Sequence, residues 1–306
     1  MRITIMTLVM LMLVLMLSIR SYPEILIVVY AAIGRSPYCS TLQAFRGAQT
    51  SFRYRRLEAS YLSSDSLFRL SESDSVGFHR WTTPEGNYWI PGGSDRVLPI
   101  LVAQQNSDIY GTGRYGVQRG DIVLDCGAHV GVFTRKALNL GASQVLAIEP
   151  ASNNVECLSR NFKLEISQGS VSVCPKGVWD RETVLELQTS EANSASDSFV
   201  MKSSPSVGQT YEVRVTTIDK LVAEMGLTRV DFIKMDVKGS AERALEGAKD
   251  TLKRYKPRLA ISTEETADDP ERIISLCRRL QPGYTVECGY CAIGNGLVQP
   301  AVLFLH

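Results

Sequence analysis

From Gly120 to the C-terminus, short apolar runs alternate with longer amphipathic stretches. Apolar runs of about four to eight residues between turn residues are typical of buried strands, and longer runs with helical spacing are typical of helices. Alternation of this kind indicates an α/β fold, with a mostly parallel sheet flanked by helices. The pattern predicts strands at 121–125, 144–149, 171–174, 230–235 and 258–263, and helices at about 131–140, 152–163, 216–225, 240–254 and 269–280.

Further apolar segments lie on either side of this region. Residues 284–287 and 301–305 are short apolar runs, and we expect them to form a C-terminal antiparallel strand pair added to the sheet. Residues 82–91 place strand-forming residues around a Pro-Glu-Gly-Asn turn, which predicts a β-hairpin. The chain therefore divides into an N-terminal hydrophobic anchor segment (1–33), a connector or cap with the hairpin (34–114) and the main domain (115–306).

The N-terminal segment has the character of a membrane helix. Residues 3–17 are apolar or weakly polar, and Ser18-Ile19 extends the run to about the lower limit for a bilayer-spanning helix. A cleaved signal peptide, an uncleaved anchor and a helix pair lying on the membrane all fit, but no small-x-small cleavage site follows promptly. Six arginines between positions 20 and 56 follow the run, against Arg2 before it. The positive-inside rule then predicts an anchor with the catalytic domain facing the cytoplasm, a cytoplasmic, peripheral protein being the alternative.

Composition narrows the classes of function. The 306 residues carry a formal net charge of +1, which argues against a nucleic-acid-binding surface. The seven cysteines are odd in number and scattered, and several lie in apolar runs. We therefore expect reduced, buried thiols rather than a disulfide framework. Cys288-Gly-Tyr-Cys291 is a C-x-x-C without a second pair, so we expect no metal site.

Two acids end two successive predicted strands. Asp125 leads into a turn that contains Gly127 and Gly131, and Glu149 ends the next strand. In open α/β sheets, ligands bind outside the carboxyl ends of the strands, so both acids are expected at one crevice. Glycine permits a close approach of backbone to ligand, and the second acid can bind a ribose diol. The pattern predicts a site for a nucleoside cofactor.

The spacing of the glycines favours one cofactor over another. A dinucleotide fingerprint reads G-x-G-x-x-G and packs a pyrophosphate against a helix N-terminus. Here the motif is Asp125-x-Gly127-x-x-x-Gly131, which lacks the middle glycine and places a carboxylate where a pyrophosphate would be repelled. A carboxylate suits the ammonium of S-adenosylmethionine (SAM). A nicotinamide cofactor is the disfavoured alternative.

These motifs, with several that follow them, resemble the FkbM-type SAM-dependent methyltransferases, a class I, Rossmann-like family. The resemblance covers roughly residues 77–306 and rests on the order and spacing of its blocks. The blocks are Gly120-Asp-Ile-Val-Leu-Asp125-Cys-Gly-Ala-His-Val-Gly131, Ala147-Ile-Glu-Pro150, Gly177-Val-Trp-Asp180, Val215-Thr-Thr-Ile-Asp219-Lys-Leu, Asp231-Phe-Ile-Lys234-Met-Asp236-Val-Lys-Gly239 and Leu245-Glu-Gly247-Ala.

The resemblance implies a cofactor site and also shows where this chain departs from the pattern. Lys238 and Ala241 stand where the family usually has glutamates, and the segment 101–110 has Gln where relatives often have Glu. The SAM site therefore matches the family while the acceptor side is altered. The expected cofactor-binding residues are Asp125 at the methionine ammonium, Gly127 and Gly131 in the turn, Glu149 at the ribose, and Gly177 and Val178 near the adenine.

Methyl transfer from a sulfonium needs in-line alignment more than covalent catalysis. For a hydroxyl acceptor, a base within hydrogen-bond reach helps to remove the proton. Asp236, Glu264 and His129 are the candidates, although a histidine inside a turn more often orders the loop. Lys234 alternates with apolar residues, so its side chain is either partly buried or directed outward.

The Ser-rich insertion at 190–206 is either a solvated loop or a mobile lid over the crevice, since it lies between the third and fourth predicted strands. The resemblance implies a methyltransferase, with O-methylation of a sugar, glycan or secondary-metabolite hydroxyl. Its expected partners are a small-molecule or glycan acceptor and a membrane, and no nucleic acid. The alternatives are a membrane-tethered SAM- or nucleoside-binding protein that has lost catalysis and a nicotinamide-dependent oxidoreductase.

Overall fold

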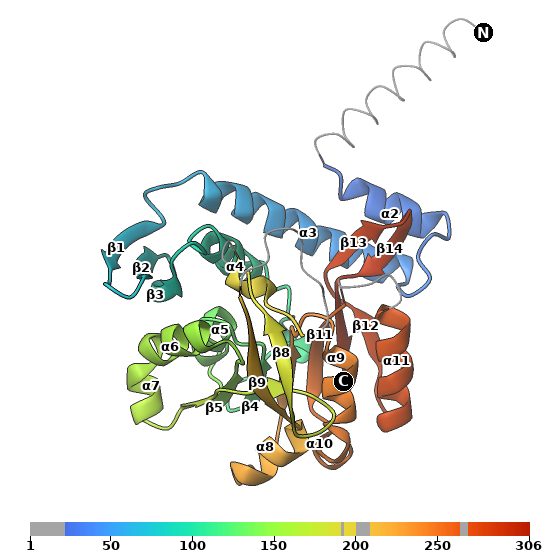
Figure 1. Cartoon of the computed structure of the whole chain (residues 1–306). Helices are drawn as coiled ribbons and strands as arrows, with labels where there is room; N and C mark the ends of the chain where they lie inside the picture. Colours follow the sequence, from blue (N-terminus) through green and yellow to red (C-terminus); the bar gives the residue numbers. More distant parts are fainter. Residues whose placement is uncertain (1–21, 191–192, 200–208, 264–268) are drawn as a thin grey trace, which may run out of the picture.

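A seven-stranded sheet forms the centre of the computed structural model, which describes residues 22–190, 193–199, 209–263 and 269–306 (Figure 1). The strand order is β12-β15-β11-β10-β4-β5-β6. All five strands predicted for the main domain are present, so the α/β expectation is confirmed. In chain order the strands are β4 (Ile122–Cys126), β5 (Gln144–Ile148), β6 (Val171–Cys174), β10 (Phe232–Met235), β11 (Arg258–Ser262), β12 (Val286–Cys288) and β15 (Val302–Leu305).

Strand direction places a crevice at β4. The five strands β6, β5, β4, β10 and β11 run parallel, while β15 is antiparallel to both β11 and β12, as predicted for the C-terminal pair. The chain proceeds from β4 to β5 on one side and returns to β10 on the other side of β4. This reversal is the topological switch point, where ligands bind beyond the carboxyl ends of the strands.

Helices cover both faces of the sheet (Figure 1). On β4, Leu124 faces a core with the helices α8 to α11, and its neighbour Val123 faces a core with α5, as the period of two in a strand requires. The predicted helix 240–254 is two helices that meet at Gly247, where a Cβ atom would collide with the carbonyl oxygen of Trp179. The helices are α5 (Val132–Asn139), α6 (Ser152–Asn161), α7 (Lys163–Ser167), α8 (Ile218–Glu224), α9 (Ala241–Glu246), α10 (Lys249–Tyr255) and α11 (Asp269–Leu280).

Two small sheets were not predicted from the sequence. One has the order β7-β9-β8 and stands beside the central sheet; its strands are β7 (Gly177–Val178), β8 (Thr183–Gln188) and β9 (Thr210–Thr216). The other is the hairpin of β13 (Cys291–Gly294) and β14 (Leu297–Pro300), inserted between the two predicted C-terminal strands. Both are short or solvent-facing, so their hydrophobic alternation is weak.

The N-terminal part forms a cap of helices and a third small sheet. The hairpin expected at 82–91 is formed by β2 and β3, with β1 as an additional strand. The long helix α3 begins with a capping box in which Ser40 and Gln43 bond each other's backbone N–H groups. The elements are α2 (Ile25–Ala32), α3 (Thr41–Leu62), β1 (Arg69–Ser73), β2 (Phe78–Thr83), β3 (Gly86–Pro91), α4 (Val97–Asn106) and the 3-10 turn η1 (Gly113–Tyr115).

The expected membrane anchor finds no support in the described residues. The apolar run at 3–19 lies wholly within 1–21, outside the described ranges. The second apolar run forms α2, which is only eight residues long and buries Ile27 and Ala31 in a core with α3 and the β13–β14 hairpin. None of the helices that can be described is long and apolar enough to cross a bilayer.

The expectation of reduced thiols is wrong for two of the seven cysteines. Cys39, between α2 and α3, forms a disulfide with Cys288 at the end of β12, 249 positions away. The other five cysteines are free and buried, as predicted. A pairing over this separation cannot be inferred from spacing, because it depends on the N-terminal helices packing against the C-terminal strands. Disulfides persist in oxidising compartments, so this bridge counts against a cytoplasmic placement of the domain.

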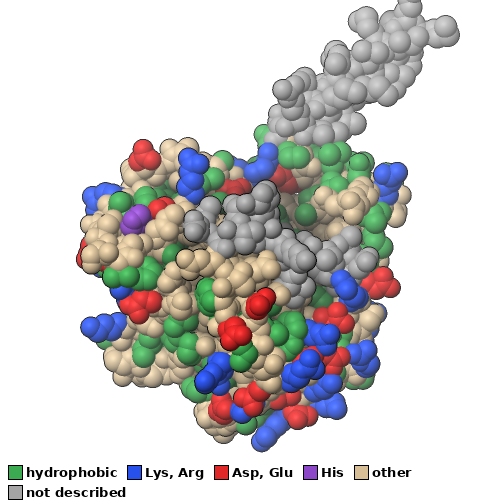
Figure 2. All heavy atoms as spheres, in the orientation of Figure 1, with side chains coloured by type: hydrophobic (Ala, Val, Ile, Leu, Met, Phe, Trp, Pro, Cys, Tyr) green, Lys and Arg blue, Asp and Glu red, His purple; other side chains and the backbone are tan. Residues whose placement is uncertain are grey.

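Charges of both signs are mixed on the face shown in Figure 2. Lys and Arg side chains alternate there with Asp and Glu, most densely in the part occupied by α8 to α11. Ion pairs between surface charges include Lys220 with Glu182 and Arg279 with Glu246. This face therefore presents no large field of one sign.

Candidate functional site

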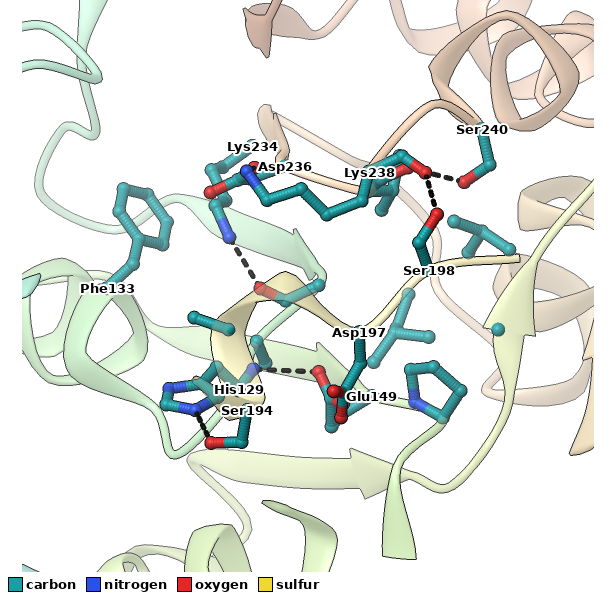
Figure 3. A pocket seen from close by; sticks show the side chains of 18 of the residues that line it. His129, Phe133, Glu149, Ser194, Asp197, Ser198, Lys234, Asp236, Lys238 and Ser240 are labelled. Carbon is teal, nitrogen blue, oxygen red and sulfur yellow. Dashed lines mark hydrogen bonds and ion pairs between the residues drawn. The ribbon is translucent and has the colours of Figure 1, made fainter. Parts of the chain in front are cut away.

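A cavity lies beyond the carboxyl ends of β4, β5 and β10, at the switch point of the sheet (Figure 3). Its walls come from the turn after β4, the end of β5, the strand β7, the helix α4 and residues 194–199 of the Ser-rich insertion. Of the predicted site residues, the structure brings Gly127, His129, Glu149, Gly177, Val178 and Asp236 together in this lining.

The turn after β4 depends on Gly127. Its φ is +77°, a left-handed conformation that glycine adopts without steric cost. A Cβ atom there would also collide with the carbonyl oxygen of Asp236, so the turn packs directly against the end of β10. The N–H groups of Gly127 and Ala128 both donate to the carbonyl of Ile148, at 3.0 Å each. The turn therefore joins the ends of three strands.

Gly131 and Asp125 support the site without lining the cavity. Gly131 has φ +91°, and a Cβ atom there would collide with Phe162 and Leu158, so this glycine permits close packing of α5. Asp125 is fully buried; its carboxylate accepts hydrogen bonds from Thr134 Oγ1 at 2.7 Å and Lys234 Nζ at 3.0 Å. Both carboxylate oxygens are thus engaged behind the cavity wall.

Lys234 is the residue whose role the sequence left open, and its side chain is buried. Besides the ion pair with Asp125, its ammonium donates to the carbonyl of Gly127 at 2.7 Å. The aromatic rings of Tyr110 and Phe133 lie 5.5 and 5.8 Å from the ammonium, at cation–π distance. Lys234 therefore fixes the glycine turn, and its alternation with apolar neighbours was the signal for burial.

Glu149 is held in place by three hydrogen bonds at the end of β5. Its carboxylate accepts from the backbone N–H of His129 at 2.9 Å, from the N–H of Ala151 at 3.1 Å and from Asn154 Nδ2 at 3.2 Å. Burial raises the pKa of the Glu149 carboxyl above its ordinary value, while these three donors favour the ionised form. An acceptor oriented in this way suits a pair of ribose hydroxyls.

His129 shapes the turn and contacts the insertion. Its φ of +52° is unusual for a residue other than glycine and marks local backbone strain at the site. Ring Nε2 lies 2.7 Å from Ser194 Oγ, and Nδ1 has no hydrogen-bond partner among the described residues. Burial and the charge of Lys234 lower the pKa of His129 to about 3, so the ring is neutral at pH 7 and weakly basic.

Asp236 lies at the end of β10 with its carboxylate in the cavity lining. It accepts from Tyr110 Oη at 2.8 Å and from Lys238 Nζ at 3.2 Å. Burial alone would raise the pKa of Asp236, but the charges of Lys238 and Lys234 and the Tyr110 hydrogen bond outweigh it and hold the pKa well below the ordinary range. Asp236 is therefore an ionised acceptor and a weak base.

Described residues of the insertion, between Ser194 and Phe199, line the cavity. Residues 193–199 include the short 3-10 helix η2 (Ser194–Ser196), and residue Ser198 pairs with Gln188 at the end of β8. Phe199 lies against Gly177, where a Cβ atom would meet its ring at 2.6 Å. The expectation of a segment over the crevice is supported for these residues, whereas 191–192 and 200–208 lie outside the described ranges.

One predicted catalytic residue cannot be placed, and two residues of the cavity lining were not predicted from the sequence. Glu264 lies outside the described residues, so its predicted catalytic role stays a prediction. Tyr110 and Asp197 were not singled out from the sequence, because neither belongs to a strand-end motif; both line the cavity. No cluster of three metal-ligating side chains occurs within the part of the chain that the structure describes.

The switch-point crevice, the glycine turn and the acid after the second strand together define a nucleoside-cofactor-binding domain of the Rossmann-like class. The model of the methyltransferase FkbM domain matches residues 125–290, more than half of the chain. The chain therefore belongs to the FkbM methyltransferase domain family, and its cofactor is S-adenosylmethionine. Gly127, Glu149 and the cavity beside them fit this cofactor.

The chain is similar to individual members of this family. It is 27% identical over 165 residues to 31-O-demethyl-FK506 methyltransferase FkbM of Streptomyces tacrolimicus, a match that covers 45% of this chain and 64% of that enzyme. The chain thus spans less than two thirds of this relative's length.

Solved structures with a similar fold include a methyltransferase FkbM from Methylobacillus flagellatus KT and a precorrin-6y C5,15-methyltransferase from Geobacter metallireducens GS-15. The first is 16% identical, with a TM-score of 0.47, and covers 85% of this chain and 59% of its own. The second is 12% identical, with a TM-score of 0.40, and covers 66% and 85%. Since both TM-scores are below 0.5, the family assignment rests on the match to the domain.

Proposed function

We propose that this protein transfers the methyl group of SAM to a hydroxyl oxygen of a small-molecule or glycan acceptor. The observation that carries the proposal is a single cavity with Glu149 at its β5 edge and the Tyr110–Asp236 pair at its β10 edge. The family assignment supports methyl transfer, and the similar FkbM enzyme of Streptomyces tacrolimicus is named for a 31-O-demethyl substrate. Oxygen as the acceptor atom is taken from that likeness.

The cofactor would be held by residues from three strand ends. Glu149 would accept hydrogen bonds from the ribose hydroxyls, and Gly177 and Val178 would lie near the adenine. The turn at Gly127 would allow the backbone to approach the amino-acid end. Because Asp125 does not line the cavity and its oxygens are engaged behind the cavity wall, we assign it to positioning Lys234 and the turn, in place of the direct ammonium contact expected from the sequence.

The acceptor would be aligned at Asp236. SAM supplies an already electrophilic sulfonium methyl, so alignment supplies much of the rate enhancement. An ionised Asp236, fixed by Tyr110, would accept a hydrogen bond from the acceptor hydroxyl and direct its oxygen toward the methyl carbon. The low pKa of Asp236 makes it a poor proton acceptor before transfer, and the neutral His129 ring is also a weak base.

A second candidate function is cofactor binding without catalysis. The observation that favours it is the ion pair of Lys238 with Asp236, since Lys238 stands where the family usually has a glutamate. Among the described residues, this pair neutralises the strand-end acid that lines the cavity at β10. A nicotinamide-dependent oxidoreductase has no such observation in its favour, given the family assignment.

Methyl transfer from labelled SAM to cell extracts separates the two candidates. We expect label in a small-molecule or glycan fraction with the intact protein, and much less with the Glu149→Ala variant at the same limiting concentration of SAM. Calorimetry with SAM and with NAD on the same samples should show binding of SAM alone. Binding of SAM without any transfer of label would favour the binding-only protein and contradict the proposed reaction.

Membrane attachment through residues 1–33 stays a prediction. Fractionation of cells that express the full chain or a chain lacking residues 1–21 tests it. Anchoring requires that only the full chain sediments with membranes. Protease protection of the sedimented protein would then report which side the domain occupies. The Cys39–Cys288 bridge favours the oxidising side.

A further inference from the structure

Asp197 faces the cofactor cavity from outside the central sheet. It lies on residues 193–199, and it lines the cavity close to Glu149 (Figure 3). Its Oδ1 accepts a hydrogen bond from the N–H of Ser190 at 2.9 Å. This is the one hydrogen bond that the described residues give the Asp197 carboxyl, so its second oxygen can meet a ligand.

The segment that carries Asp197 is fastened to the residues that hold Glu149. Ser194 Oγ lies 2.7 Å from the His129 ring, and Asn154 Nδ2 donates to the carbonyl of Ser194 at 3.3 Å. His129 and Asn154 are also two of the three donors to the Glu149 carboxylate. The segment is tied at its other end by Ser198 Oγ, which donates to the carbonyl of Lys238 at 3.0 Å. Asp197 therefore has a defined place beside Glu149.

The two carboxyls influence each other's charge. Burial and the neighbouring charge of Glu149 raise the pKa of Asp197 to about 7, against the opposing hydrogen bond from Ser190. Tyr211 faces the pair from β9, and the pKa of its phenol is raised by burial and by both acids. Lys176 also lines the cavity but forms an ion pair with Glu224, and His129 is neutral. Three N–H donors favour the ionised form of Glu149, whereas one N–H faces the Asp197 carboxyl, so Asp197 is the acid of the pair that more readily carries a proton.

We propose that Asp197 is a second cofactor-binding carboxyl, which in its protonated form donates a hydrogen bond to a ribose oxygen of the cofactor. Glu149 and Asp197 then have complementary hydrogen-bonding roles at the ribose. An ionised carboxylate can only accept hydrogen bonds, whereas each ribose hydroxyl can both donate and accept. Glu149 would accept hydrogen bonds from the ribose hydroxyls, and the protonated Asp197 carboxyl would donate a hydrogen bond to a ribose oxygen. The inference requires the SAM cofactor but no particular acceptor.

Affinity for S-adenosylhomocysteine, measured by calorimetry, tests this role without any turnover. At pH 6.5, Asp197→Ala should weaken binding about tenfold, the usual effect of one hydrogen bond. Asp197→Asn keeps a donor in place and should stay within about threefold of the parent protein. Ser196→Ala, on the same segment but outside the cavity lining, is the matched control and should bind as the parent does.

The pH dependence distinguishes proton donation from a merely structural role. If the complex keeps the proton on Asp197, the affinity of the parent protein should fall about tenfold or more between pH 6.5 and 8.5. Asp197→Asn cannot titrate and should lack this part of the fall, while the titration of the ligand's own amino group is common to both proteins. Calorimetry in two buffers should likewise show proton uptake at pH 8 by the parent beyond that of Asp197→Asn.

Equal affinity and equal pH dependence in the parent, Asp197→Ala and Asp197→Asn proteins would overturn the proposal. A weaker Asp197→Asn with the pH dependence of the parent would also overturn it, because the titrating group would then lie elsewhere. A parent protein that binds S-adenosylhomocysteine in this pattern but transfers no methyl group would leave the Asp197 assignment standing and contradict only the proposed reaction.

Discussion

Three acids that end neighbouring strands differ because their partners differ. Asp125 is sealed between Thr134 and Lys234, Glu149 accepts from three N–H donors at the cavity edge, and Asp236 is paired with Lys238. As a result, the three carboxylates have separate roles. Asp125 braces the turn, and we assign Glu149 to the ribose and Asp236 to alignment of the acceptor.

Glu149→Ala should weaken SAM binding by about 2–3 kcal/mol, since hydrogen bonds to a charged group contribute about 1.5–3 kcal/mol each. The substitution also leaves the N–H of His129 without its acceptor. Calorimetry measures the loss, and circular dichroism confirms folding. Glu156→Ala, in α6 and in an exposed ion pair with Arg160, is the control and should bind SAM normally. Full affinity in a folded Glu149→Ala protein would remove Glu149 from the ribose site.

Asp236→Asn should lower turnover by about 10- to 100-fold and leave SAM affinity nearly unchanged, because a charged acceptor of the substrate hydroxyl is lost. The pKa of Asp236 is held well below its ordinary value, so the carboxylate remains ionised as the pH falls from 8 to 5. Protonation of Asp236 should therefore cause no loss of turnover in the parent protein over that pH range.

Tyr110→Phe removes one of the two groups that fix Asp236 and should have a smaller effect in the same direction. Kinetics of Glu264→Gln complete the comparison. A silent Asp236→Asn together with a crippled Glu264→Gln would move the acceptor contact to the residues that follow β11.

At the scale of elements, β4 and β10 are joined at their carboxyl ends by a buried ion pair. Asp125 and Lys234 are neighbours in the parallel register of these strands, and their side chains are 0% and 5% exposed. Removing one member of a buried pair leaves an uncompensated charge, which costs much more than removing both. The pair therefore sets the geometry of the glycine turn, and replacing either Asp125 or Lys234 alone should destabilise the fold.

Lys234→Met should lower the free energy of unfolding by about 3–5 kcal/mol, because Asp125 is left charged and buried. The double variant Asp125→Asn/Lys234→Met should recover most of that loss. Urea denaturation at pH 7 measures both. Equal stability of the single and double variants would show that the loss in Lys234→Met does not come from the charge left on Asp125.

At the scale of the whole molecule, the N-terminal cap and the C-terminal strands form one unit. Helix α3 packs along the β13–β14 hairpin, and Gly47 on α3 lies so close to Cys291 and Gly289 that a Cβ atom would not fit. The Cys39–Cys288 disulfide closes this contact between chain segments 249 positions apart. The cap therefore holds α4, and with it Tyr110, over the acceptor side of the cavity.

Replacing both bridged cysteines by Ser should lower stability by about 2–4 kcal/mol, since a bridge over so long a loop restricts the unfolded chain. Thermal melts should show that a reductant lowers the Tm of the parent protein but not that of Cys39→Ser/Cys288→Ser. Alkylation of unfolded protein should find five reactive thiols before reduction and seven after it. Seven thiols in protein taken directly from its cells would contradict the bridge.

The sequence by itself determined the order of the main strands and helices, the glycine turn and the acids at the strand ends. Those features are local: hydrophobic period, turn residues and strand termini are all written in short segments. Glu149 and Asp236 were therefore located from motifs, whereas the apolar neighbours of Lys234 left its burial open.

The tertiary structure alone decided how these residues divide the chemistry. Lys234 is hydrogen-bonded to Asp125, 109 positions away in the sequence. Tyr110 is hydrogen-bonded to Asp236, 126 positions away. Asp197 comes to lie beside Glu149 from an insertion without periodicity, which no hydrophobic pattern could place. The Cys39–Cys288 bridge likewise joins distant segments. Contacts of this range form only when the sheet and its cap have packed, so charge state and partner choice follow from the fold and not from any single motif.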